Sequence, residues 1–147
     1  MGLSRFQYNI VLIVEIHLQI NKFINFQIGT MNIEGLRQYC LSKNFASESF
    51  PFDKTTLVFK VSDKMFALVD LNDNPPCVNL KCEPARAIEL REKYPCVTPG
   101  YHMNKKHWNT VVLDNTVSDA CVCQWIDDSY HLVVDSLPKK QSPLRNR

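Results

Sequence analysis

Short runs of mostly apolar residues between polar turns mark the middle of the chain as a series of β-strands. Residues 56–61 and 65–70 are rich in β-branched and aromatic side chains, which favour strands. Only Ser62-Asp63-Lys64 separates these runs, so we expect them to pair as a hairpin. Further strand-like stretches follow a polar loop at 72–76, and they occupy residues 77–81, 97–101 and 108–113.

Three other segments carry apolar residues at every third or fourth position, which is the spacing of amphipathic helices. The first follows Asn32, a good N-cap, and ends near Lys43, with Gly35 as its weak point. The second opens at Glu83-Pro84 and is ended by Pro95. The third follows Ser118 and carries a mostly apolar stripe: Val122, Trp125, Ile126, Ser129, Leu132 and Val133. This order of elements predicts an α+β fold with one mainly antiparallel sheet.

Residues 1–30 differ in composition from the rest, with isoleucine and glutamine concentrated there. Ile16, Leu18 and Ile20 alternate with polar residues, which predicts a short strand that could cover a sheet edge. The other interpretation is that Met31 is the true start and that residues 1–30 lie outside the domain. No apolar run reaches the length of a signal-peptide core or a membrane span. We therefore expect a cytoplasmic protein that is not inserted in a membrane.

Composition and charge exclude several classes of protein. The chain has 147 residues, of which 45% are hydrophobic and 22% charged, unlike an intrinsically disordered chain. The net charge of +2 does not by itself indicate a nucleic-acid binder. The tail at residues 138–147 is basic, however, because it contains Lys139, Lys140, Arg145 and Arg147 and no acidic residue. A basic segment of this kind can dock on a polyanion through a local patch.

The segment 99–110 has the most distinctive residue types in the chain. Two lysines, two histidines, two asparagines and two aromatic residues fall between Tyr101 and Thr110. Lysines can neutralise phosphates, asparagine can contact base edges, and aromatic rings can stack on bases. The same pattern also fits a polar loop whose Tyr101 and Trp108 bury their rings in the core.

The six cysteines do not indicate a disulfide framework or a metal site. Their spacing lacks the close ligand pairs of zinc sites, and Cys121 and Cys123 point to different sides of a helix. We interpret all six as reduced thiols and expect no cofactor. A thiol- or metal-dependent enzyme is an alternative, in which Cys82 or Cys96 would act together with His102 or His107. No sequence motif supports it. The five charged residues from Arg86 to Lys93 fit a solvated helix face.

From Met31 onward the chain resembles the MmcQ/YjbR family of small bacterial proteins. The resemblance covers about residues 31–140, and its most specific stretch is 99–110. It departs from the usual pattern at Gly35, Cys121 and Cys123. The matching stretches are Phe50-Pro51-Phe52-Asp53, Leu57-Val58-Phe59-Lys60-Val61, Lys64-Met65-Phe66-Ala67-Leu68, Val78-Asn79-Leu80-Lys81-Cys82, Pro99-Gly100-Tyr101-His102-Met103-Asn104-Lys105-Lys106-His107-Trp108-Asn109-Thr110 and Asp128-Ser129-Tyr130.

The resemblance implies a CyaY-like fold, with one antiparallel sheet and helices on one face, and a double-wing arrangement that binds DNA. It assigns DNA contact to Lys81, His102, Asn104, Lys105, Lys106, His107, Trp108 and Asn109. We therefore expect a domain at 31–137, flanked by the extension 1–30 and the basic tail 138–147. The expected function is non-enzymatic binding of duplex DNA. The alternative is a domain that binds a small molecule or a protein and has no affinity for nucleic acid.

Overall fold

The computed structural model describes residues 4–28 and 31–142, and the chain divides into two units, residues 1–30 and 31–147. The first unit contains one helix, α1 (Arg5–Ile28), so the strand predicted from the alternation at 16–20 is wrong. A lone strand leaves its backbone N–H and C=O groups without partners, whereas a helix pairs them within the segment. Within the described residues, no helix is both long enough and apolar enough to cross a bilayer.

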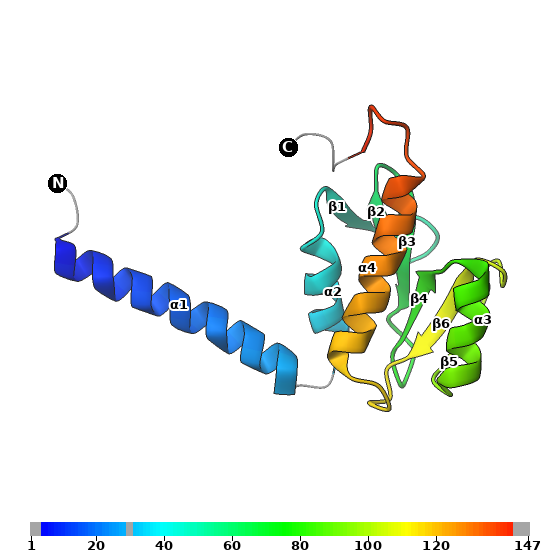
Figure 1. Cartoon of the computed structure of the whole chain (residues 1–147), viewed down its shortest axis with the longest axis horizontal. Helices are drawn as coiled ribbons and strands as arrows, with labels where there is room; N and C mark the ends of the chain where they lie inside the picture. Colours follow the sequence, from blue (N-terminus) through cyan, green and yellow to red (C-terminus); the bar gives the residue numbers. More distant parts are fainter. Residues whose placement is uncertain (1–3, 29–30, 143–147) are drawn as a thin grey trace. The chain divides into compact units, whose positions relative to one another are not determined.

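The second unit is an α+β domain with a six-stranded sheet (Figure 1). The strands lie in the order β1-β2-β3-β4-β6-β5, and every neighbouring pair is antiparallel. This confirms the predicted fold class. The elements are α2 (Ile33–Leu41), β1 (Ala46–Ser49), β2 (Thr56–Val61), β3 (Lys64–Asp70), β4 (Cys77–Lys81), α3 (Pro84–Lys93), β5 (Val97–Pro99), β6 (Trp108–Val112) and α4 (Asp119–Asp135).

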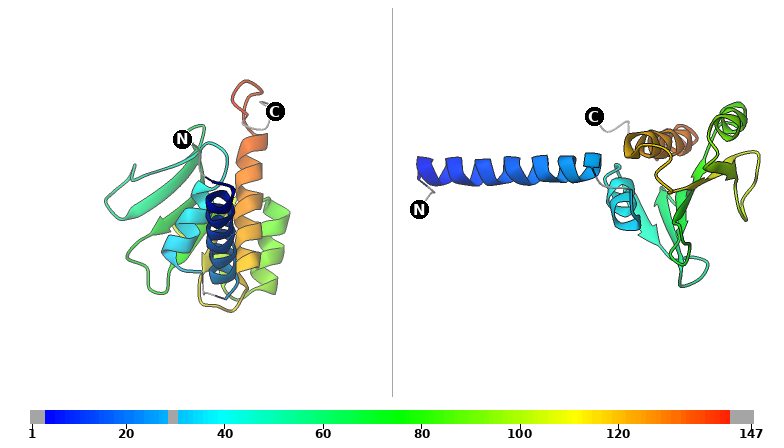
Figure 2. Two further views of the ribbon diagram at one scale, coloured as in Figure 1. Left: turned by 90° about the vertical axis from the view of Figure 1, so that its left-hand side faces the viewer. Right: turned by 90° about the horizontal axis from the view of Figure 1, so that it is seen from below.

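The three helices of this domain lie on one face of the sheet (Figure 2). Helix α4 packs on β2, β3 and β4, α3 packs on β5 and β6, and α2 packs beside β1. Phe66 lies at the centre of this layer, where its ring meets Tyr130 of α4 at 5.4 Å in an edge-on arrangement. We call the opposite side of the sheet the open face, because none of the helices in residues 31–142 covers it.

The helix starts agree with the predicted caps. Asn32 Oδ1 accepts a hydrogen bond from the Gly35 amide at 2.8 Å, and Ser118 Oγ accepts one from the Cys121 amide at 3.2 Å. Pro84 occupies the first turn of α3, where a missing N–H group costs nothing. The local sequence therefore determines where these three helices begin.

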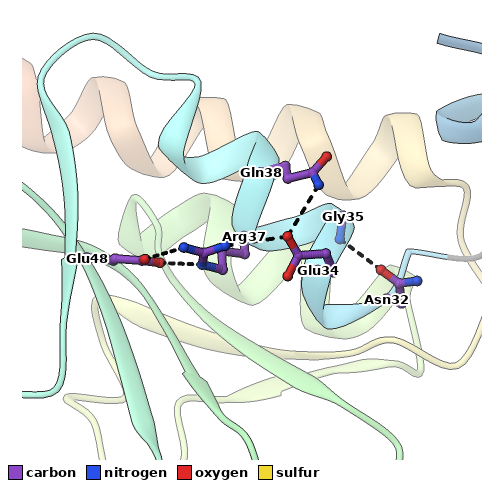
Figure 3. Close-up of polar contacts among 6 residues, drawn as sticks. All are labelled: Asn32, Glu34, Gly35, Arg37, Gln38 and Glu48. Atoms are coloured by element: carbon purple, nitrogen blue, oxygen red, sulfur yellow. Dashed lines mark hydrogen bonds and ion pairs between the residues drawn. The ribbon is translucent and has the colours of Figure 1, made fainter. Parts of the chain in front are cut away.

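Strand β1 was not predicted, because its sequence Ala-Ser-Glu-Ser has low strand propensity. A contact with α2 holds it instead (Figure 3). The Arg37 guanidinium donates two hydrogen bonds to Glu48, from Nε at 2.7 Å and from an Nη atom at 2.5 Å. These bonds lower the pKa of the Glu48 carboxyl. Pairing of its backbone with β2, together with this contact to α2, thus holds a strand that local propensity does not favour.

One buried hydroxyl connects α4 to the sheet. Ser129 is fully buried, and its Oγ donates to the Phe66 carbonyl at 2.5 Å. The same Oγ accepts a hydrogen bond from the Lys81 amide at 2.8 Å. Two backbone groups, one on β3 and one on β4, therefore have their partner on the helix. Ser129 interrupts the apolar stripe predicted on α4. The structure explains this, because the position requires a hydroxyl that bonds two backbone groups.

Candidate functional site

The 100–107 loop, which joins β5 to β6, carries most of the residues predicted to contact DNA. His102, Asn104, Lys105 and Lys106 are exposed, and His107 is half-buried. Tyr101 is 69% exposed, and its ring lies against the His102 ring with the centroids 4.0 Å apart. These side chains are therefore accessible to a partner.

Hydrogen bonds within the 100–107 loop fix its backbone. The Gly100 amide donates to the Trp108 carbonyl at 2.9 Å, and the Trp108 amide donates to the Asn104 carbonyl at 3.0 Å. Asn104 Oδ1 accepts from the Lys106 amide at 2.9 Å. Lys105 Nζ donates to the Gly100 carbonyl at 3.0 Å, so this lysine also takes part in the loop's own structure.

Arg91 of α3 holds the same loop from the helix side. Its Nε donates to Asn109 Oδ1 at 2.7 Å, and one Nη donates to the carbonyls of Lys105 and Trp108. The interpretation of residues 86–93 as a solvated face is therefore wrong for Arg91, which is half-buried. Charge patterning along one helix could not show this contact, because the acceptors lie 14 to 18 residues away.

Two residues assigned to DNA contact lie inside the domain. Trp108 is 7% exposed and packs on Val58 and Leu68 on the open face, with Met65 and Met103 beside it. Asn109 is 2% exposed, and its amide accepts from Arg91 and donates to the Ala87 carbonyl. Their side chains serve the loop's structure, so neither is available to a ligand at the surface.

Gly100 lies where a side chain has no room. A Cβ atom there would meet Trp108 Cβ at 2.8 Å and the Trp108 carbonyl oxygen at 3.0 Å. We expect Gly100→Ala to lower the free energy of unfolding by about 2 kcal/mol, because the backbone of β6 must shift. Urea unfolding of the full chain measures this loss. A matched substitution at Gly35, where the nearest atom is 3.4 Å away, should cause no comparable loss; equal effects would contradict the steric explanation.

Seven lysines gather at one end of the sheet, although four segments of the chain contribute them. We call this region the lysine end, and its members are Lys60, Lys64, Lys81, Lys105, Lys106, Lys139 and Lys140. The strand register places the first five together. Val61 pairs with Lys64 beside the β2–β3 turn, and Lys81 pairs with Trp108 next to the 100–107 loop.

The basic segment after α4 joins the same end. Ser62 Oγ donates to the Gln141 carbonyl at 3.2 Å, which brings residues 139–141 against the β2–β3 turn. Figure 1 shows this turn and the chain after α4 together at the top of the domain. Lys64 Nζ also lies 3.4 Å from Ser136 Oγ at the end of α4. Arg145 and Arg147 of the predicted basic tail lie outside the described residues.

Charge is distributed unequally between the lysine end and helix α4. None of the seven lysines forms an ion pair within the described part of the chain. Asp63, Glu83 and Asp135 are the carboxylates of the neighbouring turns and helix ends. Helix α4, by contrast, contains four aspartates and no lysine or arginine. A nearly neutral chain thus presents a positive end and an acidic helix.

The cysteines do not form a reactive or metal-binding cluster in the part of the chain described. All six are free thiols, and no group of three or more His, Cys, Asp or Glu side chains in residues 4–28 and 31–142 could hold a metal ion. Burial raises the pKa of Cys40 and of Cys123 to about 12. Cys82 lies beside His107, since its amide donates to the His107 carbonyl at 2.8 Å. Burial nevertheless raises the pKa of its thiol, which lowers the thiolate fraction that a nucleophile needs.

A small cavity lies between α3, α4 and the sheet. Its volume is about 20 Å³, enough for one water molecule. Its walls are mainly apolar, and the lining residues are Leu80, Lys81, Cys82, Leu90, Asn109, Val111, Trp125 and Asp128.

The chain is similar to known proteins in sequence and in fold. The YjbR family model matches residues 41–132. The chain belongs to the YjbR family. The uncharacterized protein YjbR of Escherichia coli K12 is 39% identical over 114 residues, which is 78% of this chain and 97% of that protein. The uncharacterized protein YbdF of Escherichia coli O157:H7 is 37% identical over 107 residues, covering 73% and 88% of the two chains.

Solved structures of similar proteins share the YjbR fold. The crystal structure of Deinococcus radiodurans protein DR2400 superimposes with a TM-score of 0.74 at 40% identity, covering 78% of this chain and 88% of that one. A Pseudomonas syringae protein gives a TM-score of 0.61 at 31% identity over 69% of this chain and 98% of its own. Sequence and structure thus agree on the family and its fold.

Proposed function

We propose that this YjbR-family protein is a non-enzymatic protein that binds duplex DNA through the lysine end. The observation that carries the proposal is the convergence of seven lysines, none of them in a described ion pair, from four chain segments on one end of the sheet. A lysine that contacts a phosphate displaces condensed counterions, and this release drives binding. A positive end therefore suits a polyanion even though the whole chain carries only +2.

The strand register gives this surface a size that fits several phosphates. Three strand spacings separate β2, which carries Lys60, from β6, which follows Lys106. At about 4.8 Å per spacing this is about 14 Å across. Duplex DNA carries one charge for every ~1.7 Å of its axis, so several phosphates can face the lysines at once. Helix α4, which contains four aspartates, disfavours binding of DNA along the face of the sheet that the helices cover.

Two hairpins supply the arms of the proposed contact. The β2–β3 hairpin ends in the Ser62-Asp63 turn, and the β5–β6 hairpin ends in the 100–107 loop. Both end at the lysine end, which supports the double-wing arrangement. On the second arm, Asn104, His102 and Tyr101 are exposed beside the lysines. These side chains can contact base edges or sugars while the lysines contact phosphates.

Replacing Lys106 and Lys139 together by alanine should weaken DNA binding and reduce its dependence on salt. Both side chains are exposed, and they come from different segments of the lysine end. Each phosphate contact contributes about 0.9 to the slope of log K against log salt, so the slope should fall by about two. Fluorescence anisotropy of labelled duplex DNA with the full chain, at ~50 to ~200 mM salt, measures the slope.

The matched control removes two lysines from the other end of the sheet. Lys54 lies in the β1–β2 loop and Lys93 at the end of α3, and both are exposed. Lys54→Ala with Lys93→Ala changes the net charge equally, so it should leave the slope nearly unchanged. Equal effects of the two double variants would remove the lysine end from the proposal. Absence of binding by the unmodified chain at the lowest salt would overturn DNA binding altogether and favour a small-molecule or protein ligand.

A further inference from the structure

Phe45, between α2 and β1, has an unusual backbone conformation and an unusual exposure. Its φ is 58°, in the left-handed region that bulky side chains rarely adopt. Its side chain is 72% exposed, the highest exposed fraction among the large hydrophobic residues described. Neither feature stabilises the fold, because the residue combines backbone strain with an apolar ring in water. Such outliers concentrate at functional sites.

The chain on both sides of Phe45 is held in place. The Ala46 amide donates to the Lys43 carbonyl at 3.1 Å, which closes a tight turn with Phe45 inside it. The Asn44 carbonyl accepts a hydrogen bond from the Tyr130 hydroxyl at 2.8 Å. Lys43 forms an ion pair with Asp127 of α4. The ring of Phe45 is therefore presented to solvent by a fixed turn.

The register places this turn at the lysine end. Ala46 pairs with Val61, so Phe45 lies beside Ser62 in the β2–β3 turn. Ser62 in turn contacts the Gln141 carbonyl, next to Lys139 and Lys140. Phe45 thus lies at the lysine end, near Lys60 and Lys64. The exposed residues Phe50 and Phe52 follow β1 at the opposite end of the sheet.

We propose that Phe45 inserts between stacked bases of the DNA that the lysine end binds. This inference rests on the proposed function and adds a contact to the bases themselves. Apolar side chains that enter a base step unstack it partly and kink the duplex, while cations nearby hold the phosphates. A rigidly presented phenyl ring among lysines has both parts of this arrangement. The strained turn then has a purpose, since it directs the ring away from the domain and toward the ligand.

The test uses duplexes that each contain one 2-aminopurine, placed at successive steps of a mixed sequence. The fluorescence of 2-aminopurine increases when the base is unstacked. With the full chain at ~50 mM salt, we expect a several-fold increase at one or more steps. Phe45→Asn should abolish the increase while keeping the salt slope of binding, because asparagine accepts a positive φ and the lysines are unchanged. Circular dichroism verifies that the variant is folded.

Phe52→Asn is the matched control, since Phe52 is 63% exposed at the other end of the sheet. It should keep the full fluorescence increase. An increase that persists in Phe45→Asn would overturn the insertion. Salt-dependent binding by the unmodified chain without any fluorescence increase would also overturn it, and would leave the proposed function intact. No binding in the anisotropy assay would overturn both proposals.

Discussion

Replacing Arg91 by methionine is expected to lower the free energy of unfolding by about 3 kcal/mol. Methionine keeps the apolar stem of the side chain but removes every donor. Asn109 Oδ1, which is buried, and the carbonyls of Lys105 and Trp108 then lose the guanidinium. A hydrogen bond from a charged donor contributes about 1.5–3 kcal/mol, and a buried acceptor left unpaired costs about 1–3 kcal/mol. Urea unfolding of the full chain measures the loss.

Arg86 on the same helix provides the control. Its guanidinium forms an ion pair with Glu89 at 2.8 Å, and both side chains are largely exposed. Exposed pairs of this kind contribute a few tenths of a kcal/mol, so Arg86→Met should change stability very little. If the two variants lost equal stability, Arg91 would not be the residue that anchors the 100–107 loop.

Ser129→Ala is the second substitution with a large expected effect, a loss of about 2–3 kcal/mol. Removal of the hydroxyl leaves the Phe66 carbonyl and the Lys81 amide without this partner, and the site is fully buried, so water cannot replace it without a rearrangement. The volume change is small, hence the loss comes from unpaired polar groups rather than from a cavity. Thermal and urea unfolding of the full chain both report it.

Ser49→Ala tests whether replacement of an exposed serine has the same effect. Ser49 is exposed at the end of the edge strand β1, so its replacement should change the free energy of unfolding by no more than a few tenths of a kcal/mol. A loss at Ser129 no larger than that at Ser49 would contradict the bridging role. The pair of variants therefore separates burial of the hydroxyl from residue type.

Most of the fold could be predicted because its elements obey local rules. Asn32 and Ser118 occupy the capping positions that their side chains favour, and the β2–β3 hairpin combines two β-prone runs with a short turn. Two elements escaped prediction. Strand β1 depends on its pairing with β2 and on the Arg37–Glu48 contact, and no local pattern shows either of them. In α1 the alternation of apolar residues indicated a strand, but backbone pairing within a helix prevails over a pattern only a few residues long.

The candidate site could be predicted only in part. Residue types identified the 100–107 loop, because its basic, polar and aromatic side chains adjoin in sequence. They could not show that Trp108 and Asn109 face inward, since burial depends on the strands opposite them. Lys60, Lys64 and Phe45 were not proposed as contacts, because only the strand register brings them to the same end as the loop. The positive φ of Phe45 has no sequence signal either.

The hydrogen bonds inside the 100–107 loop have a consequence for binding thermodynamics. Most loops lose conformational entropy when a partner orders them, and that loss is subtracted from the affinity. Here the amides of Gly100, Lys106 and Trp108 already have their partners, and Arg91 fixes the strand that follows. The backbone is therefore ordered before any ligand arrives. The loop backbone therefore loses its conformational entropy when the protein folds, and binding of a partner needs to order only the exposed side chains.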